Sequence, residues 1–188
     1  MKTSIILFAA LFLLASCQKE LVDLPQAPKV ASSAVAKINT DTIADHAAFK
    51  IKLVKDSINT DETMIIFNKT SHLDYSGAED ALYMQGYGQE SLASISHDGR
   101  DLVFNNVPYT PGMSIGLDVK VQSDGPYMLQ LSYQTKLPAN TRIWLKDNYL
   151  KDSVNVRTVN YHFNISKTDT NSFGKNRFKL VIRGNGEQ

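Results

Sequence analysis

The sequence predicts an all-β domain, an antiparallel β-sandwich with jelly-roll or Greek-key connections, preceded by a signal peptide and a flexible tether. From residue 47 onward, apolar residues recur at every second position in five separate runs, the period of a strand with one buried face. Turn-forming pairs such as Asp98-Gly99 and Pro111-Gly112 separate the runs. No segment of this region keeps a helical period, so an all-β class is expected.

The first seventeen residues have the features of a secretory signal and a lipid anchor. Lys2 supplies a positive start, and the apolar run from Ile5 to Leu14 is too short to cross a bilayer. The ending Leu14-Ala15-Ser16-Cys17 resembles the lipobox of bacterial lipoproteins, in which the chain is cut before an acylated cysteine. The resemblance implies that 1–16 is a signal peptide and that Cys17, the only cysteine, carries lipid. An incidental thiol in a longer signal is the alternative.

Residues 17–46 are expected to form the lipidated cysteine and a flexible tether, because Pro25 and Pro28 interrupt any helix. Lys19 and Glu20 follow Cys17 closely, which resembles the export signal of surface lipoproteins in Bacteroidetes-type bacteria. That signal usually carries more than one acid, and here Glu20 stands alone. The resemblance implies an outer-membrane lipoprotein exposed on the cell surface. An ordinary polar tether is the alternative.

The charge balance argues against nucleic acid as a partner. The chain has 20 Lys and Arg against 19 Asp and Glu, and loss of residues 1–16 removes only Lys2 from this count. The mature chain is therefore formally neutral, whereas nucleic-acid binding needs a concentrated basic face. Attachment to a membrane is expected through the acyl chains on Cys17 instead, because several chains anchor a protein stably.

About ten short strands are expected within the predicted domain, residues 47–188. The alternating runs have their apolar members at Phe49, Ile51 and Leu53; Ile115, Leu117, Val119 and Val121; Leu129, Leu131 and Tyr133; Tyr161, Phe163 and Ile165; and Phe178, Leu180 and Ile182. Shorter apolar runs at 63–67, 92–95 and 102–104 fit further strands. Each alternating run is expected to turn its apolar side chains toward one core.

The order of these strands and turns resembles a β-sandwich module of secreted and surface proteins of Bacteroidetes. The resemblance covers 47–183 and rests on the order and spacing of short motifs. The motifs are 49–53, 61–67, Asp74, 80–82, 92–96, 98–99, 115–117, 125–127, 137–138, 143–147, 161–163 and 176–178. Such modules stand near the C-terminus of multidomain proteins that use type IX secretion. They look like structural or binding appendages without a catalytic set, so the resemblance implies a non-catalytic role.

No arrangement typical of an enzyme is found in the sequence. Ser96, His97 and Asp98 are neighbours, and adjacent residues of a strand point to opposite faces, so they cannot form a catalytic triad by themselves. The acids lie mostly in turns, where solvation accounts for them. The histidines are all expected on the surface: His46, His72, His97 and His162. The chain is therefore not expected to be an enzyme.

The loop 74–80 contains the only candidate metal ligands. Nitrogen or sulfur ligation of a metal needs clustered His or Cys, which the sequence lacks. Calcium takes oxygen ligands, and Asp74, Glu79 and Asp80 could surround one ion, although the loop does not match an EF-hand. A solvated acidic loop is the alternative, and no other cofactor is expected.

Aromatic residues are the best indication of a binding site. Trp144 lies between Ile143 and Leu145, so it faces outward if those two residues face the core. Tyr149 lies in the turn that follows and is a second candidate for ligand binding. Outward rings stack on sugars or on a partner protein. The alternative is that Trp144 fills the core of the sandwich.

Thr42 is a candidate for O-glycosylation. The triplet Asp41-Thr42-Ile43 resembles the acceptor pattern of Bacteroidetes secreted proteins and lies in the tether. The same pattern recurs at 56–58 and 152–154, where it is a weaker indication.

Taken together, these features predict a non-catalytic, lipid-anchored protein that displays a binding or structural β-sandwich at the outer membrane. Its expected partner, besides the membrane, is a glycan or an envelope protein. Two alternatives stay open: a periplasm-facing subunit of an envelope complex, and a small glycan-active hydrolase.

Overall fold

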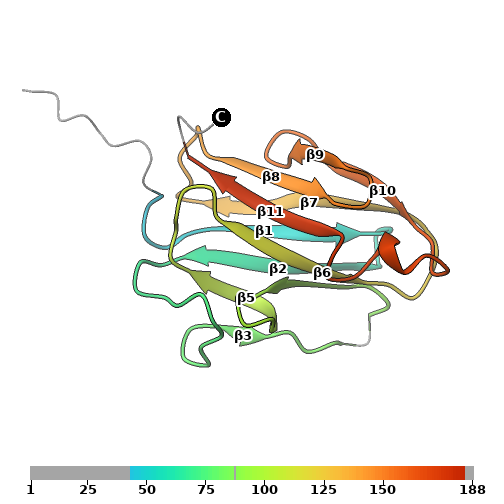
Figure 1. The fold of residues 1–188 in the computed structure, drawn as a ribbon, viewed down its shortest axis with the longest axis horizontal. Helices are drawn as coiled ribbons and strands as arrows, with labels where there is room; N and C mark the ends of the chain where they lie inside the picture. The colour runs from blue at the N-terminus through green and yellow to red at the C-terminus, as the bar shows by residue number, and fades with distance from the viewer. Residues whose placement is uncertain (1–42, 87, 185–188) are drawn as a thin grey trace, which may run out of the picture. The chain divides into compact units, whose positions relative to one another are not determined.

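The computed structural model describes residues 43–86 and 88–184 (Figure 1). The predicted all-β class is confirmed: this part of the chain contains eleven strands and one short 3₁₀ helix, η1 (Thr170–Ser172). The strands are β1 (Ala47–Val54), β2 (Thr60–Phe67), β3 (Ala81–Leu82), β4 (Ser91–Ile95), β5 (Asp101–Val107), β6 (Ser114–Lys120), β7 (Gly125–Thr135), β8 (Arg142–Asp147), β9 (Asp152–Asn155), β10 (Tyr161–Ile165) and β11 (Phe178–Arg183). In these residues no helix is long and apolar enough to cross a membrane.

The strands are hydrogen-bonded along one continuous path, in the order β10-β7-β1-β2-β5-β4-β6-β11-β8-β9, with β3 paired to β5. All pairs are antiparallel except β2 and β5, which run parallel. The prediction of a wholly antiparallel sandwich was therefore wrong at this pair. A parallel pair needs a long crossover connection, which residues 68–100 supply through β3 and β4.

The sheet folds over on itself, so that β6, β11 and β8 lie in front of β2, β1 and β7 (Figure 1). Aromatic rings join the two layers across the interior. The Phe163 ring of β10 lies 4.8 Å from that of Phe178 in β11, and the Tyr161 ring lies 6.3 Å from Phe178, measured between centroids. One hydrophobic cluster thus serves both layers.

The predicted alternation is confirmed in most strands. The core cluster contains Phe49, Ile51 and Leu53 of β1; Ile115, Leu117 and Val119 of β6; Tyr161, Phe163 and Ile165 of β10; and Phe178, Leu180 and Ile182 of β11. All of these side chains are buried. Period-two patterning was therefore sufficient to assign the inward face of these strands.

The alternation fails at the end of β7, where Tyr133 is 46% exposed although it was predicted on the inward face. The register against β1 shifts there: Leu131 pairs with Ile51, but Tyr133 pairs with Lys50. Ser132 is thus an extra residue, a β-bulge that turns the following side chain to the other face.

Candidate functional site

Trp144 lies on the outer face of β8, away from the core. Its neighbours Ile143 and Leu145 are buried in the core cluster, and side chains alternate between the faces along a strand. Trp144 is partly buried and is not one of the residues that pack against that cluster. The sequence left open whether this ring fills the core or faces outward, and the structure places it outward.

Two like-charged pairs flank Trp144 on the outer face of β8 and β11. We call this set the Trp144 face; its cross-strand pairs are Arg142 with Arg183, Trp144 with Val181, and Lys146 with Lys179. Same-face residues of a strand are about 7 Å apart, so the two charged pairs are separated by about 14 Å. Like charges directly opposite one another in a sheet are destabilising.

No carboxylate neutralises these four cations within the described residues. None of their side chains takes part in an ion pair or a hydrogen bond there. The neighbouring strands add Ser114, Gly116 and Asp118 from β6, and Ser153 and Asn155 from β9. Asp118, the one acid among them, is paired with Lys120. The Trp144 face is therefore a positively charged surface with one aromatic ring at its centre.

Other lysines near this part of the sheet are neutralised. Lys120 Nζ lies 3.0 Å from carboxylate oxygens of both Asp101 and Asp118, and Lys175 Nζ lies 2.7 Å from Asp101. Lys146 and Lys179, by contrast, have no acidic partner among the described residues. Sequence reasoning singled out Trp144 but missed the cations. The positions of Arg142 and Lys146, two residues to either side of Trp144, were the available signal in the sequence. Their pairing with Arg183 and Lys179 could be known only from the register of β8 and β11.

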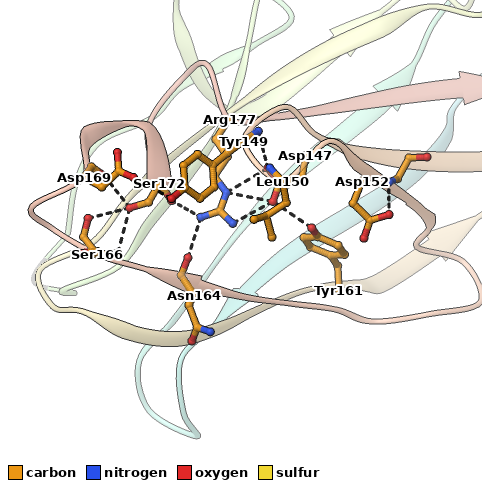
Figure 2. A network of polar contacts seen from close by, with 11 residues as sticks. Asp147, Tyr149, Leu150, Asp152, Tyr161, Asn164, Ser166, Asp169, Ser172 and Arg177 are labelled. Carbon is orange, nitrogen blue, oxygen red and sulfur yellow. Dashed lines mark hydrogen bonds and ion pairs between the residues drawn. The ribbon is translucent and has the colours of Figure 1, made fainter.

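Tyr149, the second predicted binding residue, follows β8 and belongs to a different arrangement (Figure 2). Its hydroxyl donates to Asp169 Oδ2 at 2.8 Å, and its ring lies 5.1 Å from the Arg177 guanidinium. The hydrogen bond to Asp169 raises the pKa of the Tyr149 phenol. The hydroxyl group and the ring of Tyr149 thus both contact neighbouring side chains of the fold.

Arg177 and Asp147 form the centre of a buried polar network (Figure 2). Arg177 Nη2 donates to Asp147 Oδ2 at 2.9 Å, and its Nη1 donates to the carbonyl oxygens of Asn164 and Ser172. The Tyr161 hydroxyl donates to the same Asp147 oxygen at 3.0 Å. Burial, together with this carboxylate, raises the pKa of Tyr161 well above its usual value.

Aromatic rings enclose the guanidinium of this network. Its central carbon lies 4.7 Å from the ring centroids of both Phe163 and Phe178, and Tyr149 covers it from outside. The network joins β8, β10 and the segment before β11. Since the ion pair has no exposed side-chain surface, we interpret it as a structural brace.

The predicted calcium ligands are directed to different protein partners. Asp74 Oδ1 pairs with His97 Nδ1 at 2.7 Å, and Glu79 lies 3.5 Å from His72 Nδ1. Asp80 accepts from the backbone N–H groups of Ser76 and Asn106. No group of three or more metal-ligating side chains occurs in the described part of the chain. The structure therefore does not bring these three carboxylates together.

The candidate triad residues are also separated. Ser96 Oγ donates to Asp98 Oδ1 at 2.5 Å, whereas His97 is paired with Asp74. Ser96 and His97 share no hydrogen bond, as the opposite faces of adjacent residues predicted. The four histidines are exposed. Serine activation by a neighbouring histidine is not supported by this geometry.

The remaining predicted sites, Cys17, Lys19, Glu20 and Thr42, lie outside the described residues. No family model matches the chain, and no curated protein or solved structure matches it. The resemblances to lipoproteins and to the Bacteroidetes module therefore stay predictions from the sequence.

Proposed function

We propose that this domain is a non-catalytic binding module whose Trp144 face recognises acidic glycans. The observation that carries the proposal is the lone outward tryptophan between two like-charged pairs without carboxylate partners. An indole ring offers an apolar face to a sugar ring, and Lys and Arg make charge-assisted hydrogen bonds to carboxylate or sulfate groups. The two kinds of group together match a sugar chain that carries negative charges.

The geometry supports a ligand that runs along the strands. The arginine pair lies about 7 Å to one side of Trp144, and the lysine pair lies about 7 Å to the other side. A sugar ring stacked on Trp144 would therefore have acidic groups of neighbouring units within reach of both pairs. A single small anion would use only one pair, so an oligosaccharide is the better match.

The proposal is tested by affinity electrophoresis of the domain in gels that contain polygalacturonate, chondroitin sulfate or dextran sulfate. Fully methyl-esterified polygalacturonate and plain dextran are the matched neutral polymers. We expect retardation by at least one acidic polymer and by neither neutral one. Because salt screens exposed charges, retardation should also weaken as ionic strength rises.

Variants locate the binding surface. Trp144→Ala should weaken binding without changing its salt dependence, whereas Lys146→Ala/Lys179→Ala should weaken binding and flatten the salt dependence. Lys52→Ala is the control, because Lys52 lies on the outer face of β1 in the other layer. Absence of binding to all three acidic polymers, or equal loss with Lys52→Ala, would contradict the proposal.

We infer that the domain is displayed from a lipid anchor at Cys17, on the basis of the lipobox-like sequence. Cys17→Ser should abolish labelling by an alkyne-tagged palmitate and release the domain from the membrane fraction. Protease treatment of intact cells distinguishes the two orientations. Digestion of the wild type with protection of Lys19→Ala/Glu20→Ala supports surface display, and protection of both favours the periplasm.

A further inference from the structure

A cavity of about 300 Å³ lies beside β4, β5 and β6, and Ser114 and Gly116, which border the Trp144 face, also line it. Most of its wall is apolar, with contributions from Leu73, Ile95, Val107, Met113 and Ile115. Binding sites for small molecules are typically concave, mostly apolar and supplied with few polar groups. The volume is at the lower end of the usual range for such sites, about 300–1,000 Å³.

Asn105 contributes a buried polar group to this cavity, and Ser96, the other buried polar residue in the wall, already has hydrogen-bond partners. Asn105 is only 1% exposed, and its Nδ2 has no hydrogen-bond partner. Its backbone is fixed in β5, where it pairs with Ile65 of β2, so the side chain cannot leave by a loop movement. A buried amide without a partner is destabilising, and such groups call for an explanation in a native structure.

A second polar contact holds part of the cavity wall in place. His97 lines the cavity, and its Nδ1 lies 2.7 Å from Asp74 Oδ1. The backbone N–H of His97 donates to the carbonyl oxygen of Leu73 at 3.0 Å, which ties two lining segments together. This side of the wall is thus fixed by hydrogen bonds.

We propose that this cavity binds a small, mainly apolar molecule whose carbonyl oxygen accepts a hydrogen bond from Asn105 Nδ2. The terminal torsion of an asparagine is broad, so the carboxamide can turn its N–H toward such a ligand. The apolar wall takes the body of the molecule, and Asn105 fixes its orientation. The proposal does not rest on glycan binding at the Trp144 face.

Two probes of nearly equal shape test the proposal: acetophenone, which carries a carbonyl, and ethylbenzene, which does not. Both are titrated into the ¹⁵N-labelled domain and followed by NMR. We expect acetophenone to bind several-fold more tightly and to shift the Asn105 side-chain amide signal, together with backbone signals of Ile95 and Val107. Equal affinities, or shifts confined to other residues, would overturn the proposal without any variant.

Asn105→Leu then separates a ligand contact from a structural role. Replacing an unpaired buried amide by an apolar group of similar size is expected to leave the thermal midpoint unchanged or raised. The several-fold preference for acetophenone should disappear. Asn160→Leu is the matched control, since Asn160 is exposed and does not line the cavity. A large loss of stability in Asn105→Leu would show that this amide has a structural partner and would overturn the assignment.

Discussion

Arg177 and Asp147 form an ion pair with no exposed side-chain surface, and their closest atoms, Nη2 and Oδ2, are 2.9 Å apart. The two residues are thirty positions apart and join the end of β8 to the start of β11. Desolvation of two charges is expensive, so such a pair is stable only when further hydrogen bonds complete it. Here Tyr161, two backbone N–H groups and two backbone carbonyls do so.

We predict that Asp147→Asn lowers the free energy of unfolding by about 3–5 kcal/mol, because it leaves the Arg177 charge buried without a counter-ion. Urea denaturation followed by circular dichroism measures this loss. The control is Glu62→Gln, which breaks the partly exposed pair with Lys50 and should cost about 1 kcal/mol or less. Similar small losses in both variants would show that Arg177 is hydrated and not a brace.

We predict that Tyr161→Phe reduces the loss of stability at alkaline pH. Burial beside Asp147 raises the pKa of Tyr161 in the folded state, whereas an unfolded tyrosine titrates near about 10. The folded state therefore holds its proton more tightly, and that stabilisation is complete below about pH 10 and is lost above it. Unfolding free energies from pH 8 to 11 should fall more steeply for the wild type than for Tyr161→Phe. Tyr133→Phe, at an exposed ring, should retain the wild-type slope.

We predict that the carboxyl group of Asp56 stays ionised to an unusually low pH and so stabilises its turn. The backbone N–H of Asn59, its side-chain amide and the N–H of Ile58 donate to this carboxylate and lower the pKa of Asp56 to about 2. Since the folded pKa is below the unfolded value of about 3.9, the turn is stabilised above pH 4 and loses that stabilisation as the pH falls toward 2. NMR titration of the carboxyl carbon measures the midpoint. Asn59→Ala should raise the titration midpoint of Asp56. A wild-type midpoint near the unfolded value of about 3.9 would refute the proposed role of these hydrogen bonds.

The inward faces of β1, β6, β10 and β11 could be predicted because each repeats one local pattern. Tyr133 could not, since the bulge at Ser132 depends on pairing with β1. Asp147 continues the inward alternation of Ile143 and Leu145, so its burial was open to prediction. The burial of Arg177 was not, because Asp147 and the rings around it come from distant parts of the sequence.

The same distinction applies to the two candidate sites. The outward position of Trp144 was one of two interpretations that the sequence left open, and local alternation decided between them only once the burial of Ile143 and Leu145 was known. The opposition of Lys146 and Lys179 depends on the register of two strands that are far apart in sequence. The cavity at Asn105 has no local signal, because its wall comes from separate strands and loops.

We predict that Lys179→Glu stabilises the domain and weakens glycan binding. Lys179 lies directly opposite Lys146, and an opposite-charge pair in that position contributes about 0.2–1 kcal/mol relative to a neutral pair. Urea denaturation should therefore show a gain in the free energy of unfolding. Retardation by acidic polymers should fall, because one cation is lost and its partner becomes neutralised.

Lys52→Glu is the control, because it should lower the free energy of unfolding that Lys179→Glu is expected to raise. Lys52 lies opposite Glu62 on the outer face of β1, where a second acid would create a like-charged pair. Stability should fall by a similar small amount, and retardation by acidic polymers should not change. If Lys179→Glu lowered stability while binding persisted, the two lysines of the Trp144 face would not repel one another. Their unpaired charge would then have no role in recognition.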